Sequence, residues 1–309
     1  MAILFHSDLD DPTEWRKAFK HFAPDMPFYV WPDQPNSLEV DIAVVWKPTS
    51  RIWKSYPNIK LIASLGAGVD HLFRFHTLPK GVPVTRIVDK TLTEQMVEYV
   101  VMATLFCHRN MPTYIVQQRS KKWQPVPQPL GRDCSIGIMG LGVLGSSVAR
   151  ALHHLNFDVK GWSRSPKDIK GIKSYVGNEE LNNFLIGNDI LISLLPLTPK
   201  TENIVDKNLL SCLQEGSQFI NAGRGAHVVE PDLIKALDEG IISHAFLDVT
   251  REEPLPKKNR LWSHPNVTLT PHVASITDAF SSSKQIIENF ERLEAGLELL
   301  NIVDPQVGY

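Results

Sequence analysis

The chain has 309 residues, of which 43% are hydrophobic and 21% charged, a composition typical of a globular protein with a substantial core. Its 32 basic and 34 acidic residues give a net charge of -2, and the basic residues are scattered, which argues against a nucleic-acid partner. This length exceeds that of most single domains, so we expect two.

The three cysteines and the N-terminus bear on the cellular compartment. Cys107, Cys134 and Cys212 have no CxxC spacing and lie in or beside apolar runs, which predicts buried, reduced thiols rather than a metal site. The N-terminal MAILFHSDLDD has no basic segment, and no run approaches the ~18 apolar residues of a membrane span. We therefore expect a cytoplasmic protein without a membrane partner.

The first hundred residues alternate short apolar runs with helical patterns. AILFH at 2–6 precedes a helix around residues 14–21, and DIAVVW at 41–46 and KLIASLG at 60–66 follow. This alternation predicts an α/β domain with a mainly parallel sheet.

Two features near the ends of these strands are candidate substrate contacts. LGAGVD at 65–70 is a glycine loop whose amides at Ala67 and Gly68 suit a carboxylate, although a plain turn fits the same residues. Trp46, at the end of DIAVVW, either lines a substrate pocket or fills the core.

A long apolar pattern at 93–108 predicts a buried helix between two domains, with a boundary near residue 98. Six further strand patterns then follow, the number of a complete dinucleotide fold, and the tail from Thr277 is helical. The sequence thus predicts two doubly wound parallel sheets around a cleft. We expect a flavodoxin-like substrate domain at 1–98 plus 275–309, and a Rossmann dinucleotide-binding domain at 99–274.

The strand pattern at 134–139 runs into a glycine fingerprint followed by the helical SSVARALHHL. The first glycine permits a tight turn, the second lets the backbone approach a pyrophosphate, and the third lets helix and strand pack closely. The fingerprint predicts a cofactor loop made of Gly140, Gly142, Val143, Leu144 and Gly145.

The next strand pattern ends without the acidic residue that commonly holds the ribose of NAD. Ser163 and Arg164 stand there instead, and a hydroxyl with a guanidinium suits a 2′-phosphate. We therefore expect NADPH as the preferred cofactor, with NADH possible. The alternative is that Arg164 is an ordinary solvated residue.

Three polar residues follow consecutive strand patterns: Arg224, Glu253 and His272. Reduction of a 2-keto acid needs a cation for the carboxylate, a proton donor for the new alkoxide, and a group that keeps the donor protonated. Arg224, His272 and Glu253 match these needs in that order. Taken singly, each also fits a structural role: a cap arginine, a surface glutamate and a core histidine.

Over nearly its whole length the chain resembles the D-isomer-specific 2-hydroxyacid dehydrogenases. The likeness rests on these motifs: LGAGVD at 65–70, EQMVEY at 94–99, GIMGLGVLG at 137–145, WSRS at 162–165, LLPLTPKT at 194–201, NAGRGAHVVE at 221–230, LDVTREEPLP at 247–256 and TPHVA at 270–274. Ser163-Arg164 departs from the family's commoner acid but agrees with its NADPH-preferring reductase branch.

The resemblance implies a homodimeric reductase of small 2-keto acids such as glyoxylate and hydroxypyruvate, with Arg224, Glu253 and His272 as catalytic residues. Ala67 and Gly68 would bind the substrate carboxylate. Its further cofactor contacts fall on Pro196, Thr198, Ala222 and Asp248. Thr250 replaces an aromatic residue that is often found there, which leaves the local packing in question.

Two other readings remain at this point. One is a different member of the family, such as a D-lactate, phosphoglycerate or formate dehydrogenase, although the chain has no length for the extra regulatory domain of many phosphoglycerate enzymes. The other is a nucleotide-sensing binding protein that has the fold without turnover, against which the three polar residues argue.

Overall fold

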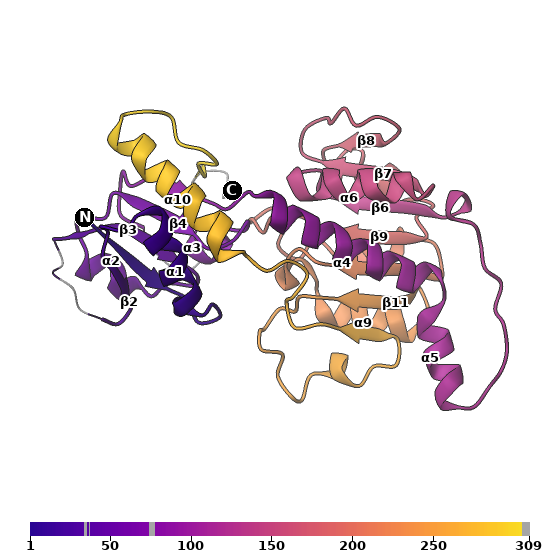
Figure 1. Cartoon of the computed structure of the whole chain (residues 1–309). Coiled ribbons are helices and arrows are strands. Elements are labelled where there is room, and N and C mark those ends of the chain that lie inside the picture. The colour runs from indigo at the N-terminus through magenta and orange to yellow at the C-terminus, as the bar shows by residue number, and fades with distance from the viewer. Residues whose placement is uncertain (34–35, 37, 74–77, 305–309) are drawn as a thin grey trace. The chain divides into compact units, whose positions relative to one another are not determined.

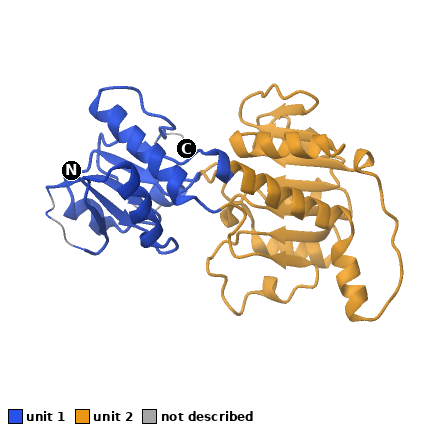
Figure 2. Ribbon diagram, viewed as in Figure 1, with its two compact units in different colours: residues 1–92, 276–309 blue, residues 93–275 orange. Residues whose placement is uncertain are grey.

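The computed structural model describes residues 1–33, 36, 38–73 and 78–304 and divides into two compact units (Figures 1 and 2). Unit 1 comprises residues 1–92 and 276–309, and unit 2 comprises residues 93–275. The sequence predicted that the first domain boundary would fall after residue 98 and the second after residue 274, whereas the two units meet after residues 92 and 275. Each unit contains one parallel sheet, so the predicted α/β class with two parallel-sheet domains is confirmed.

The sheet of unit 1 has five described strands in the order β2-β1-β3-β4-β5, which is the flavodoxin-like order. Its strands are β1 (Ala2–His6), β2 (Phe28–Val30), β3 (Val40–Val45), β4 (Leu61–Ser64) and β5 (Val84–Thr85). The central strands β1, β3 and β4 are almost wholly buried, which explains why they are apolar except at His6, Asp41 and Ser64. The edge strands β2 and β5 are short, and the sequence patterns did not reveal them.

The helices of unit 1 are α1 (Pro12–Phe22), α2 (Ser50–Ser55), α3 (Asp70–Phe73) and α10 (Ala279–Glu294). Helix α1 begins where the Asp11 carboxylate accepts from the N–H of Thr13 at 2.8 Å. Helix α10 packs against α1, and Ile302 bridges to Thr85, so the C-terminal segment is part of this unit.

Unit 2 has a seven-stranded sheet in the order β12-β11-β10-β9-β6-β7-β8. Its strands are β6 (Ser135–Met139), β7 (Asp158–Ser163), β8 (Lys173–Val176), β9 (Ile190–Ser193), β10 (Ser217–Asn221), β11 (Ile242–Leu247) and β12 (Val267–Leu269). Six of them match the six strand patterns. The seventh, β8, is a half-buried edge strand with the sequence KSYV, which is too polar to be recognised as an apolar run.

Helices cover both faces of this sheet, which gives three layers (Figure 1). One core cluster joins it to α4 (Lys90–His108) and α6 (Val143–His154). The other joins it to α7 (Leu181–Leu185), α8 (Lys207–Ser211) and α9 (Glu230–Asp238). Helix α5 (Met111–Arg119) follows α4, and three 3-10 turns complete the unit: η1 (Gly131–Asp133), η2 (Gly225–His227) and η3 (Arg260–Trp262).

Helix α4 begins earlier than its apolar pattern indicates. The pattern places its start at Thr93, whereas the helix begins at Lys90 because the Asp89 carboxylate accepts from the N–H of Leu92 at 2.7 Å. No helix among residues 1–33, 38–73 and 78–304 has the length and apolar character needed to cross a bilayer.

The cysteines are all free thiols. Cys107 and Cys134 lie in the core of unit 2, and burial raises the pKa of each to about 12. Cys212 is half-buried rather than buried, so the expectation of burial is wrong for that residue.

Candidate active site

The carboxyl ends of β10, β11 and β12 lie side by side because their last residues are in register, Asn221 with Leu247 and Leu247 with Leu269. Arg224, Glu253 and His272 follow these three strand ends. Adjacent strand ends at a carboxyl edge are where open α/β sheets bind ligands.

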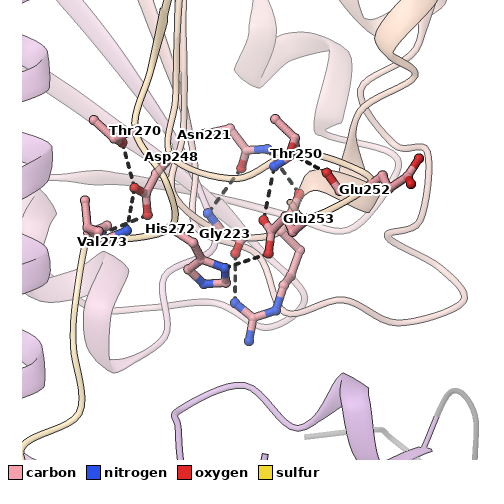
Figure 3. Close-up of polar contacts among 11 residues, drawn as sticks. Asn221, Gly223, Asp248, Thr250, Glu252, Glu253, Thr270, His272 and Val273 are labelled. Carbon is pink, nitrogen blue, oxygen red and sulfur yellow. Dashed lines mark hydrogen bonds and ion pairs between the residues drawn. The ribbon is translucent and has the colours of Figure 1, made fainter. Parts of the chain in front are cut away.

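Glu253 and His272 form a direct ion pair, and Figure 3 shows their side chains directed toward each other. His272 Nδ1 lies 2.9 Å from Glu253 Oε2, and Glu253 Oε1 accepts from the N–H of Thr250 at 3.2 Å. The side chains are 28% and 27% exposed, so the pair is only partly screened by water. Because Nδ1 faces the carboxylate, Nε2 is the ring nitrogen on the opposite side.

The backbone of His272 is held in the left-handed region, with φ at 56°. This conformation is uncommon for a residue with a Cβ, and it persists only where the surroundings enforce it. The N–H of His272 donates to the carbonyl of Asp248 at 2.8 Å, which anchors the histidine to the end of β11.

Asp248 organises the whole segment that carries His272. Its carboxylate, in a residue only 2% exposed, accepts from Thr270 Oγ1 at 2.7 Å and from the N–H groups of Val273 and Ala274 at 2.8 and 2.9 Å (Figure 3). Three donors compensate the cost of burying the charge. Asp248, which the sequence predicted only as a cofactor contact, therefore also fixes the backbone on both sides of His272.

Sequence reasoning missed Tyr99, which extends this network from α4. Its hydroxyl hydrogen-bonds to Thr270 Oγ1, and burial, with the nearby Asp248 charge adding to it, raises the pKa of Tyr99. The motif at 94–99 contains Tyr99, but no local pattern indicates its partner, which lies 171 positions away.

Arg224 lies in a loop fixed by two buried polar residues that sequence reasoning also missed. Asn221 Nδ2 donates to the carbonyl of Arg224 at 3.0 Å, and Asn221 Oδ1 accepts from the N–H of Gly223 at 3.1 Å. The N–H of Arg224 lies 3.2 Å from His227 Nδ1, and the guanidinium donates to the Gly223 carbonyl at 2.9 Å. The sequence signal for both is their place inside the motif at 221–230 that also contains Arg224.

The loops of Arg224 and Glu253 are in direct contact. A Cβ at Gly225 would lie 1.9 Å from the backbone carbon of Thr250, so only glycine permits this approach. Thr250 holds its own turn by donating from Oγ1 to the Glu252 carbonyl at 2.8 Å. The structure therefore brings the loops of all three predicted catalytic residues together.

The glycine loop has the geometry that its sequence predicts for a phosphate site. Gly140 has φ at 101°, and a Cβ at Gly145 would lie 1.8 Å from the carbonyl of Gly140. A Cβ at Gly142 would meet no heavy atom within 4 Å, which leaves space at the N-terminus of α6. Val143 and Leu144 are the first residues of that helix. Space beside helix N–H groups fits a pyrophosphate.

Three other predicted cofactor residues of unit 2 follow β9, the strand beside β6, and β10, the next strand in the sheet. The N–H of Leu194 donates to the Met139 carbonyl at 2.9 Å, which sets the chain after β9 beside the glycine loop. Pro196 and Thr198 follow in a turn that Thr201 Oγ1 closes, donating to the Pro196 carbonyl at 2.6 Å. The buried Ala222 follows β10, and its N–H donates to the Ser193 carbonyl at 3.3 Å.

Ser163 and Arg164 differ in their surroundings. Ser163 is buried and its hydroxyl donates to the Ser165 carbonyl at 2.7 Å, so its proton is used within the turn. Arg164 is exposed at the end of β7, next to the strand that leads into Gly140. Arg164 is accordingly the better placed of the two to meet a phosphate.

The predicted substrate residues Trp46, Ala67 and Gly68 belong to unit 1 and follow β3 and β4. Trp46 reaches the glycine loop of that unit, because a Cβ at Gly66 would lie 3.0 Å from its ring. Within the described part of the chain, no group of three or more His, Cys, Asp and Glu is placed to hold a metal ion.

Known proteins similar to this chain share both its length and its fold. Residues 101–274 match the family model described as D-isomer specific 2-hydroxyacid dehydrogenase, NAD binding domain. Glyoxylate/hydroxypyruvate reductase A of Yersinia enterocolitica is 40% identical, with both chains covered completely. The protein of the same name from Serratia proteamaculans is 39% identical, again over both whole chains.

Two solved structures superpose closely. A D-isomer specific 2-hydroxyacid dehydrogenase from Xanthobacter autotrophicus, in complex with NADPH and MES, has a TM-score of 0.95 and 40% identity over 100% of this chain and 99% of its own. An NADPH-dependent glyoxylate/hydroxypyruvate reductase from Sinorhizobium meliloti, in complex with NADP and sulfate, has a TM-score of 0.93 and 38% identity over 100% of both chains. The chain belongs to the D-isomer-specific 2-hydroxyacid dehydrogenase family.

Proposed function

We propose that this protein reduces small 2-keto acids with NADPH, glyoxylate to glycolate and hydroxypyruvate to D-glycerate. The observation that carries the proposal is the Glu253–His272 pair, 2.9 Å apart, next to the loop of Arg224. Full-length relatives that are 40% and 39% identical and named for this activity support it.

The residues of unit 2 fit the cofactor on one structural ground, the space that a Cβ at Gly142 would enter beside the first N–H groups of α6. Gly140, Gly142 and the start of α6 would hold the pyrophosphate, and Arg164 the 2′-phosphate. When bound, NADPH supplies the hydride that adds to the keto carbon.

The chain's own residues bind the substrate and supply the proton. Arg224 pairs with the carboxylate and polarises the neighbouring carbonyl, for which its planar guanidinium is suited. His272 donates the proton from Nε2 to the carbonyl oxygen, because Nδ1 is directed at Glu253. Glu253 holds the ring through its contact with Nδ1, so that Nε2 keeps its direction before and after the transfer.

The residues of unit 1 complete the proposal. The amides of Ala67 and Gly68 hold the substrate carboxylate, as consecutive backbone N–H groups do for anions. Trp46 lines the substrate pocket from the neighbouring strand end. We also assign the protein to the cytoplasm.

We further propose a homodimer. Unit 2 exposes large apolar side chains along α4, α5 and the chain that follows them: Met102 at 45%, Leu105 at 38%, Met111 at 40%, Val116 at 52% and Trp123 at 101%. Such a concentration on one stretch of chain suits an interface with a second copy. Sedimentation of wild type and Met102→Asp tests this, because the charged variant should sediment as a monomer.

Initial rates with glyoxylate, hydroxypyruvate, pyruvate and phenylpyruvate, each with NADPH and with NADH, test the function. We expect the highest kcat/KM for the first two acids with NADPH, and His272→Ala measures any contaminating activity. A protein that binds NADPH but turns over none of the four acids would instead be the nucleotide-sensing alternative. Preference for pyruvate would indicate a D-lactate dehydrogenase.

A further inference from the structure

A buried histidine in unit 1, His71, joins the two loops that carry the predicted substrate residues. It lies on α3 and is only 5% exposed. Its Nδ1 accepts from the N–H of Lys47 at 3.2 Å, and its Nε2 lies 3.1 Å from Ser64 Oγ. Because Nδ1 accepts from a backbone donor, the proton of the neutral ring is on Nε2 and is donated to Ser64.

The hydroxyl of Ser64 continues this chain of hydrogen bonds. Ser64 is wholly buried, and its Oγ donates to the Gly68 carbonyl at 3.2 Å while accepting from the N–H of Gly66 at 3.4 Å. One hydroxyl therefore holds both ends of the segment whose amides, at Ala67 and Gly68, are proposed to bind the carboxylate. The donor direction is fixed throughout, from Lys47 through His71 and Ser64 to Gly68.

The other loop depends on the same histidine. The ring centroids of Trp46 and His71 are 4.3 Å apart. Lys47, next to Trp46, has φ at 44°, in the left-handed region that is unfavourable for a lysine. His71 holds its N–H, and His6 Nε2 lies 3.3 Å from its carbonyl. His71 and His6 therefore hold this backbone conformation from its two sides, and His71 is the one that connects it to the loop of Ala67 and Gly68.

We propose that His71 is a positioning residue for the substrate, which sets Trp46 and the Ala67–Gly68 amides relative to one another without touching the substrate. The inference rests on the proposed function. A purely structural role is the weaker explanation, because an apolar ring would fill the same space without the cost of burying two ring nitrogens and a hydroxyl. The hydrogen-bond relay from Lys47 through His71 and Ser64 to Gly68 instead fixes one geometry for the two loops that follow β3 and β4.

Two substitutions separate the two halves of the relay. His71→Asn keeps an acceptor near the position of Nδ1 for Lys47 but is too short to reach Ser64, and His71→Gln keeps a donor near Nε2 but offers Lys47 no acceptor. We expect each to raise the KM for glyoxylate roughly five- to ten-fold, the size of one lost hydrogen bond. The kcat and the Kd for NADPH should remain at wild-type values.

Ser64→Ala removes the shared hydroxyl and provides the same measurement if a His71 variant does not fold. The double variant Ser64→Ala/His71→Asn should be no worse than Ser64→Ala alone, since the serine substitution already removes the bond between the two side chains. His21→Asn is the matched control, an exposed histidine of the same unit that should leave the KM unchanged.

An unchanged KM in both His71 variants and in Ser64→Ala, with any loss confined to thermal stability or kcat, would overturn the proposal. If wild type bound NADPH without reducing any keto acid, the proposed function would fail separately. The relay would then be judged by calorimetry of oxalate binding to wild type and His71→Asn. Weaker binding by the variant would support the relay, and equal Kd values would refute it.

Discussion

Adding a single methyl group at Gly142 or at Gly145 should have opposite consequences, although both glycines belong to the same loop. At Gly142 the new Cβ meets no heavy atom within 4 Å, and the backbone is in an extended conformation with φ at -72° that alanine adopts freely. At Gly145 it would lie 1.8 Å from the Gly140 carbonyl oxygen, whereas real Cβ contacts are not shorter than 3.0 Å. Helix α6 and the turn must separate by about 1.2 Å, the difference between these two distances.

The sizes of the two effects follow from this geometry. Overpacking of a well-packed site costs about 1–3 kcal/mol, and each kcal/mol lowers the Tm by about 2–4 °C in a domain of this size. Gly145→Ala should therefore lower the Tm by roughly 5–10 °C. Gly142→Ala should leave the Tm within about 3 °C of wild type, because the change in unfolded-state entropy is small. It should raise the Kd for NADPH at least about ten-fold, since the methyl group occupies the proposed pyrophosphate space.

Thermal unfolding without nucleotide and fluorescence titration with NADPH measure the two quantities on the same samples. A wild-type Kd for NADPH in Gly142→Ala would show that this loop does not bind the pyrophosphate. An unchanged Tm in Gly145→Ala would refute the argument from close packing. A large loss of stability in Gly142→Ala would mean that the space at that glycine is not open.

Four further outcomes are expected. Arg164→Asp should raise the KM for NADPH far more than the KM for NADH, because it replaces a partner of the 2′-phosphate with a repelling charge. Equal changes in the two KM values would exclude Arg164 as the phosphate contact. Arg224→Lys should lower kcat/KM for glyoxylate about 100-fold or more while the Kd for NADPH changes little, since an ammonium group cannot make a two-point contact with the substrate carboxylate. Near-normal turnover by this variant would show that Arg224 is not part of the site. Glu253→Gln should lower kcat for glyoxylate while the Kd for NADPH changes little, because it removes the carboxylate that holds His272 Nδ1. An unchanged kcat would contradict the coupling of the two residues. Burial lowers the pKa of His244 from 6.5 to about 4, so the stability contributed by the neutral ring is present above pH 6.5 and is lost as the pH falls toward 4. The Tm of His244→Gln should therefore decline less than the Tm of wild type between pH 7 and pH 5. A parallel decline of the two Tm values would count against this cause.

Local patterns were sufficient for the parts of the fold that are buried on both sides. Strand β9 is apolar up to its last residue, because helices cover both faces of its sheet. The polar residues that follow strands of this sheet marked the site. The edge strand β8 carries no such run, since it packs on one side only. The start of α4 was misplaced for a different reason, because Asp89 and Thr93 both have side chains that suit a helix cap.

The supports of the site could not be read from the sequence. Tyr99 is joined to Thr270 by a tertiary contact, and no local pattern encodes a pairing over 171 positions. Sequence also gives the type of a side chain but not where its proton goes. Ser163 matched a phosphate contact by type, whereas its hydroxyl donates to the carbonyl two residues further along the chain.

The split course of unit 1 along the chain has a consequence for biosynthesis. Its sheet is encoded before residue 92, but α10, which buries Ile286, Ile287 and Phe290, is encoded after residue 276. Unit 2 is uninterrupted and is complete once Ser275 has left the ribosome, so it is free to fold while α1 still lacks the helix that packs against it. A nascent chain that stops short of α10 would therefore carry a finished unit 2 behind an incomplete unit 1, whose apolar surface is open to chaperones and proteases.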